Sequence, residues 1–225
     1  IIGVIMIPLK NPDKKSIENI FNKSFDPISR KINNLHNYTS PIVYHGTFAE
    51  FEKFDKSKIG SSTKTPFAQY GFFFASNPKV ALSYASKQVK QQRIIKDKIE
   101  KLMNQDFTKI FSNFLNGVYL NKNDEKTLKL MKLLDEYFIL DEEEPTLDEH
   151  GTVKKYILHF KNPFIIDMEG NPEKEFPENI VPLIKSKGHD GLIIKNTFDA
   201  ITSTSLFEPT NIYVAFDESQ IEEII

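Results

Sequence analysis

Two short apolar segments, separated by a polar loop and followed by a helix signal, constrain the fold of this chain more than any other feature. The first, Ile42–Thr47, is a strand-type run that ends in His45-Gly46-Thr47. The second, Tyr70–Ser76, contains three consecutive phenylalanines, and Asn77-Pro78 then supplies an N-cap and a first helical residue. A glycine after the histidine lets a ligand approach the backbone, because glycine has no Cβ. We therefore predict a strand, a loop, a strand and a helix that together frame a binding site.

The segments on either side of this core differ in their periodicity. Residues 1–40 hold a strand-type run at Ile2–Pro8 and two short helical patterns, which we interpret as an N-terminal lead-in. Residues 90–151 carry apolar side chains at helical spacing, which predicts a helical insertion. From Thr152 onward, short strand patterns alternate with turns. The chain is therefore predicted to be a single α+β domain over 1–225, with two mainly antiparallel sheets.

Local signals place the elements near the C-terminus. Ile180–Lys185 has the pattern of a short helix that Gly188 ends, and Gly188–Gly191 forms a turn into the next strand. Asn211–Asp217 is predicted to be the last strand, and Ser219–Ile225 has a helical bias.

Composition excludes several classes of protein. The chain has 225 residues, of which 40% are hydrophobic, enough for one large domain. Its net charge of −2 gives no global attraction to nucleic acid or to anionic membranes. The absence of cysteine excludes disulfides and thiolate metal sites, and no metal site is expected. Ile1–Leu9 is too short to span a bilayer and lacks a basic n-region, so we expect no signal peptide.

The order of these segments resembles the PARP-like, diphtheria-toxin-type ADP-ribosyltransferases, in a phage- or toxin-like branch. The likeness covers roughly 42–85 and 154–221 and leaves the insertion outside it. Tyr84 lies eleven positions after Phe73, as does the second tyrosine of the family. The matching segments are Tyr44–Thr47, Gly71–Ser76, Asn162–Asp167, Gly188–Lys195 and Asn211–Asp217. The resemblance implies the split β-sandwich of that family and NAD+ as the co-substrate.

The resemblance also implies a role for individual residues. His45 would bond the adenosine ribose of NAD+, and the Gly46 backbone would bond the nicotinamide carboxamide beside Thr47. Tyr84 would stack on the nicotinamide ring, and Phe73 occupies the position of the first tyrosine of the family. Stacking a cationic ring on an aromatic face is favourable by roughly 0.5–2 kcal/mol.

Two positions depart from the family pattern. Phe73 lacks the usual hydroxyl, which the nearby Tyr70 could supply. The glutamate that catalyses transfer in the family aligns with Ile212, and its loss goes with transfer of single ADP-ribose units or with inactivity. Glu208, four residues upstream of Ile212, is a hypothetical replacement. The loop 61–68 would lie over the donor.

Three functions remain open on the sequence. The first is a mono-ADP-ribosyltransferase, acting on a protein or nucleic acid as a toxin, effector or phage-related factor, with an antitoxin or regulator as a further partner. The second is a degraded module that binds NAD+ or a partner, and the third is an NAD+ glycohydrolase. We expect a cytoplasmic protein, or one delivered into the cytoplasm of a target cell, and no membrane partner. His45, Phe73, Tyr84 and Glu208 also have purely structural interpretations, as a strand-end hydrogen bonder, core packing and a solvated acid.

Overall fold

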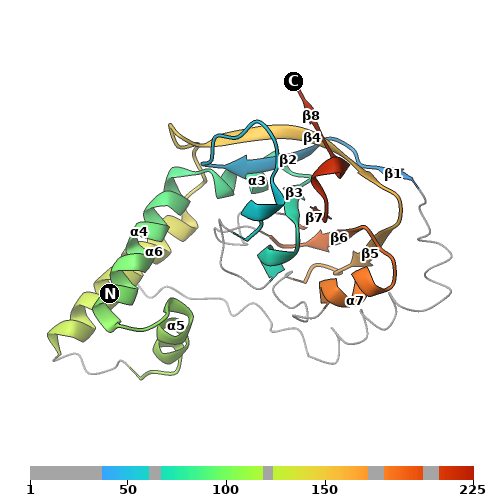
Figure 1. Ribbon diagram of the computed structural model, residues 1–225. Coiled ribbons are helices and arrows are strands. Elements are labelled where there is room, and N and C mark those ends of the chain that lie inside the picture. The colour runs from blue at the N-terminus through green and yellow to red at the C-terminus, as the bar shows by residue number, and fades with distance from the viewer. Residues whose placement is uncertain (1–36, 61–66, 119–123, 172–179, 200–207) are drawn as a thin grey trace.

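The computed structural model describes residues 37–60, 67–118, 124–171, 180–199 and 208–225 (Figure 1). The predicted strand at Ile2–Pro8 and most of the predicted donor-covering loop, 61–66, lie outside the described residues.

The strands and helices follow the sequence signals closely in the first half. The strand ending in His-Gly-Thr is β2 (Val43–Thr47), the phenylalanine strand is β3 (Phe72–Ala75), and both predictions are confirmed. Helix α3 (Pro78–Tyr84) begins where Asn77 accepts a hydrogen bond from the Lys79 backbone N–H, and Pro78 is its first residue. The remaining strands are β1 (Tyr38–Thr39), β4 (Thr152–Phe160), β5 (Pro163–Asp167), β6 (Gly191–Thr197), β7 (Thr210–Ala215) and β8 (Ile221–Ile224). The remaining helices are α4 (Lys87–Met103), α5 (Phe107–Leu115), α6 (Glu125–Glu142) and α7 (Ile180–Ser186).

Hydrogen-bonded ladders join the described strands along one path. The order is β1-β4-β2-β3-β7-β6-β5, and β8 pairs with β4 away from this path. Among the described pairs β5–β6 is parallel and the others are antiparallel, as expected for a mainly antiparallel α+β domain. The expected division into two sheets is not confirmed. The weakest link is β2–β3, which is paired only at Tyr44 and Ala75.

Two apolar clusters cover the two faces of the curved sheet. The helix-side cluster lies against α3 and α7 and consists of Ala75, Val80, Phe164, Ile166, Met168, Ile180, Val181, Ile184, Leu192, Ile194, Ile212 and Val214. The aromatic cluster consists of Val43, Phe72, Phe74, Tyr156, Leu158, Phe160, Ile165, Ile193, Tyr213 and Ala215. Side chains alternate along a strand, so Phe72 and Phe74 join the aromatic cluster while Ala75 joins the other. The sheet therefore separates two environments that the sequence presents as one aromatic run.

Three helices between α3 and β4 have an apolar cluster of their own. Figure 1 shows α4 and α6 side by side, extending away from the sheet, with α5 packed near their far end. Their core consists of Ile95, Ile99, Ile110, Leu130 and Leu134. The base of this helical unit is tied to the domain by the Ser86 hydroxyl, which donates to the Ser83 carbonyl of α3, and by a salt bridge of 3.0 Å between Lys90 and Asp148. None of the described helices is long and apolar enough to cross a bilayer.

The helical bias expected over Ser219–Ile225 is wrong. Asp217 caps a single 3-10 turn at Glu218–Gln220, and the chain then continues as β8, in antiparallel register with Leu158–Lys155 of β4. Pairing with a strand distant in the sequence overrides the weak local preference, which only tertiary structure can decide.

Candidate active site

His45 is fixed in one tautomer by the strand beside it. Its Nδ1 lies 2.8 Å from the carbonyl oxygen of Phe73. Because a carbonyl can only accept, Nδ1 carries the hydrogen, and in the neutral ring Nε2 is left as an acceptor. Burial lowers the pKa of His45, with the bond to Phe73 opposing that shift, so the neutral form dominates near pH 7. The ring contacts Phe54 and Phe74 at centroid distances of 5.1 and 5.5 Å.

Close packing requires a glycine at position 46. The space that a side chain would occupy is filled by the protein and is not open to a ligand. A Cβ at this position would lie 1.7 Å from the carbonyl oxygen of Ala81, so helix α3 occupies the space. The interpretation that the absent Cβ admits a ligand is therefore wrong. The Gly46 backbone pairs with Val153 of β4, and the described ladder between β2 and β3 does not extend to Gly46. The peptide edge of Gly46 that faces β3 thus carries no ladder bond within the described structure.

The aromatic residues predicted for the site all pack against the helix-side cluster. Tyr70, Phe73 and Tyr84 are each partly buried and pack against the helix-side cluster. Tyr84 is the last residue of α3, and the contact between Ala81 and Gly46 holds that helix against β2. Three aromatic rings from a 3-10 turn, a strand and a helix therefore pack against one cluster, and Tyr84 among them belongs to the helix that contacts Gly46.

Ile212 lies in the floor of the same cluster. It is 1% exposed and pairs with Ala75 of β3 and Ile194 of β6. Its side chain is on the face of the sheet that carries Tyr84, which is consistent with its alignment to a site position. An aliphatic side chain in this position can pack but cannot hydrogen-bond a sugar.

The two polar residues at the edges of the predicted site differ in what they contact. The Thr47 hydroxyl accepts a hydrogen bond of 2.9 Å from the Ala49 backbone, which shapes the chain after β2. Glu208 is exposed, and its carboxylate has no hydrogen-bond partner among the described residues. Nothing in the described contacts brings Glu208 to the tyrosines.

Sequence reasoning missed an acid that does contact the site. The Tyr84 hydroxyl donates a hydrogen bond to the carboxylate of Asp199, in the connection between β6 and β7. The two residues are 115 positions apart, and no motif surrounds Asp199. Only the tertiary structure could have found this pair.

The predicted residues are neighbours without sharing one pocket. The His45 ring contacts members of the aromatic cluster, whereas Tyr84 and Phe73 pack on the helix-side cluster, so the sheet lies between the imidazole and the phenol. The link between them is short, since Gly46 follows His45 and contacts Ala81, one turn of helix before Tyr84. A ligand that reaches both must pass the part of β2 that lies beyond its described ladder with β3.

The comparison of the sequence with protein families decides the class of this domain. The model of a family described as ADP-ribosyltransferase in polyvalent proteins matches residues 39–225. The chain belongs to this family. No curated protein and no solved structure matches it. The resemblance to ADP-ribosyltransferases drawn from the motifs is therefore confirmed, and enzymes of this class use NAD+ as co-substrate.

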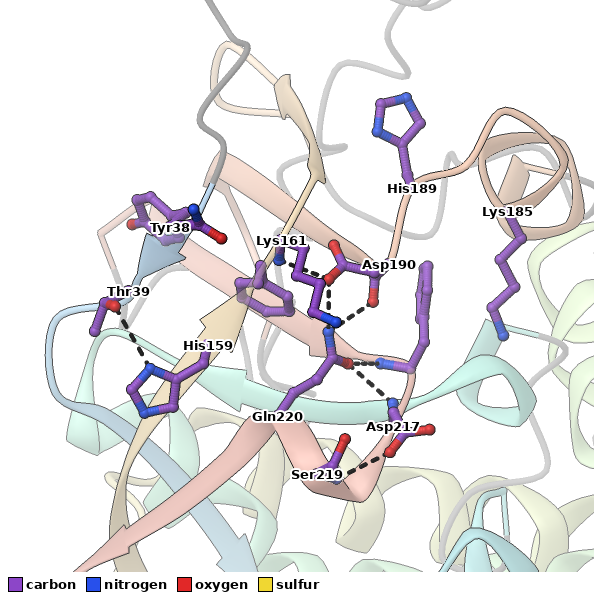
Figure 2. Close-up of a pocket in the computed structure, with 13 residues that line it drawn as sticks. Tyr38, Thr39, His159, Lys161, Lys185, His189, Asp190, Asp217, Ser219 and Gln220 are labelled. Carbon is purple, nitrogen blue, oxygen red and sulfur yellow. Dashed lines mark hydrogen bonds between the residues drawn. The ribbon is translucent and has the colours of Figure 1, made fainter.

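A hollow of about 700 Å³ lies elsewhere on this ADP-ribosyltransferase domain (Figure 2). Its lining includes Lys161, Asp190 and Gln220 but none of the predicted donor-site residues. Figure 2 shows Gln220 between Asp190 and Asp217, bonded to the Asp190 carbonyl and carboxylate and to the Asp217 backbone N–H. The Lys161 backbone N–H, just after β4, also donates to the Asp190 carboxylate, so these bonds link the ends of β4, β6 and β7, and we interpret the hollow as structural.

The described residues of the ADP-ribosyltransferase domain contain no group of three His, Asp or Glu side chains arranged to hold a metal ion.

Proposed function

We propose that this chain is a mono-ADP-ribosyltransferase that moves one ADP-ribose unit from NAD+ to a macromolecular acceptor, a protein or a nucleic acid. The observation that carries the proposal is the short ladder between β2 and β3, which has one described pair at Tyr44 and Ala75 and does not reach Gly46, beside the locked His45. On a domain of this family, an imidazole acceptor then lies on one face of the sheet and three aromatic side chains lie on the other, with the peptide edge of Gly46 between them.

Each part of this arrangement matches a part of the dinucleotide. The Nε2 atom of His45 is an acceptor, and a hydroxyl of the adenosine ribose is a donor. The open peptide edge of Gly46, with Thr47 beside it, offers backbone groups to the nicotinamide carboxamide. The ring of Tyr84 would stack on the nicotinamide, with Phe73 and Tyr70 at its margin. Because His45 and Tyr84 lie on opposite faces, NAD+ would cross the sheet at Gly46, beyond the described ladder between β2 and β3.

The reaction then requires mainly orientation and charge stabilisation. The bond between the ribose C1′ and the nicotinamide nitrogen breaks, and its electron pair neutralises the departing ring. The positive charge that develops on the ribose is quenched when an acceptor nucleophile bonds to C1′ and releases its proton. Ile212 offers no carboxylate to the ribose hydroxyls, which supports transfer of single units over polymer synthesis.

The burial of Ile212 also favours a second candidate, a module that binds NAD+ or a partner without turnover. An NAD+ glycohydrolase needs the same donor site and uses water as the acceptor. Incubation with NAD+ labelled in the adenosine half distinguishes the three. Label on a macromolecule supports transfer, free nicotinamide without macromolecular label supports hydrolysis, and binding without either product supports the module.

The biological role of the reaction depends on which macromolecule accepts the ADP-ribose. A toxin, effector or phage-related role, with an antitoxin or regulator that covers the site, is part of the proposal. Incubating the protein with NAD+ and fractionated cell extract would identify the labelled acceptor. Prior digestion of the extract then identifies the acceptor class: loss of label after protease indicates a protein, and loss of label after nuclease indicates a nucleic acid.

A further inference from the structure

The pair formed by Tyr84 and Asp199 links the end of α3 to the connection that follows β6. Tyr84 ends α3, whose backbone packs directly on Gly46. Asp199 lies two residues beyond Thr197, which is fully buried, pairs with Thr210 of β7 and bonds the Asn171 carbonyl at 2.8 Å. Their hydrogen bond therefore joins the end of α3 to the residue that lies two positions after β6, and it orients the phenol.

A carboxylate at the phenol hydroxyl changes what the ring prefers to contact. A charge-assisted bond of this kind is stronger than a neutral one, and it raises the electron density of the ring. An electron-rich aromatic face attracts a cation more strongly, whereas its attraction for an uncharged ring gains much less. Both residues are partly buried, so water screens the negative charge less than it would at an open surface.

We propose that Asp199, acting through Tyr84, makes the donor site selective for a positively charged nicotinamide ring, and hence for NAD+ over NADH. This inference rests on the proposed function, because it assumes that Tyr84 stacks on the nicotinamide. Asp199 is a positioning and specificity-determining residue in this account, since it acts through the phenol rather than on the ribose.

Calorimetric titration of the whole chain with NAD+ and with NADH tests this inference without requiring turnover. Asp199→Asn keeps an oxygen that accepts the Tyr84 hydrogen bond but removes the charge. Tyr84→Phe keeps the ring and removes the bond to the charge. We expect each variant to lower the ratio of NAD+ to NADH affinity about 5–10-fold, mainly through weaker NAD+ binding. Asp135→Asn, an exposed acid on α6, is the matched control and should leave the ratio unchanged.

The double variant sharpens the test. Because both changes interrupt the same interaction, Asp199→Asn with Tyr84→Phe should lower the ratio no further than either single variant. Equal losses of NAD+ and NADH affinity leave the ratio unchanged, indicate a merely structural role and overturn the inference. The proposed function would then stand, provided that the wild type binds NAD+. A wild type that binds neither dinucleotide would overturn both proposals.

Discussion

Substitution of Gly46 by alanine tests the central packing of the site directly. The added Cβ would lie 1.7 Å from the Ala81 carbonyl oxygen and 2.7 Å from its carbonyl carbon. To reach about 3 Å, the shortest separation a Cβ tolerates, α3 must move by more than about 1 Å. The obstacle is helix backbone rather than a flexible side chain, so the cost should lie near the upper end of overpacking, about 3 kcal/mol.

Thermal unfolding followed by circular dichroism gives the measurement. For a domain of this size, about 3 kcal/mol lowers Tm by roughly 6–12 °C. Gly170→Ala is the matched control. Its φ of +84° disfavours alanine, but the added Cβ meets no atom within 4 Å, so we expect a loss of only about 1–2 kcal/mol. A Gly46→Ala protein that melts no lower than the control would refute the contact between α3 and β2. The same variant should bind NAD+ more weakly, because α3 carries Tyr84.

Three further predictions concern the residues around this contact. The low pKa of His45 means that the unfolded chain binds a proton below pH 6.5 that the folded protein does not, so the free energy of unfolding should fall as pH drops through 6.5. His45→Gln should flatten that dependence in urea titrations between about pH 5 and 8, and an identical slope would contradict the burial of the imidazole. Ile212→Glu should destabilise the protein by about 3–5 kcal/mol near pH 8 and by less at pH 5, where a buried carboxyl becomes protonated. An equal destabilisation relative to the wild type at both pH values would show that position 212 is hydrated. Phe54→Ala should lower the free energy of unfolding in urea by about 3 kcal/mol, since the Phe54 ring packs on His45, Phe72 and Phe74. Almost no change would show that this ring is exposed to solvent.

The local elements of the site could be predicted because their signals are short-range. The N-cap at Asn77 with Pro78, and the apolar runs of β2 and β3, depend on neighbours within a few residues. The tautomer of His45 could not be predicted, because it depends on a carbonyl 28 residues away. The reason for Gly46 was equally out of reach, since its constraint comes from a helix packed across the strand. The strand β8 was missed for the same cause, as its pairing with β4 is non-local.

The sequence by itself determined the class of this protein, since ordered motifs from Tyr44 to Asp217 identify an ADP-ribosyltransferase domain. It also determined that position 212 lacks a carboxylate. The tertiary structure alone decided on which face of the sheet each site residue lies, and which acid reaches Tyr84. The physical reason is that strand alternation and motif order are local properties of the chain, whereas the contact between Tyr84 and Asp199 exists only after segments 115 residues apart have packed together.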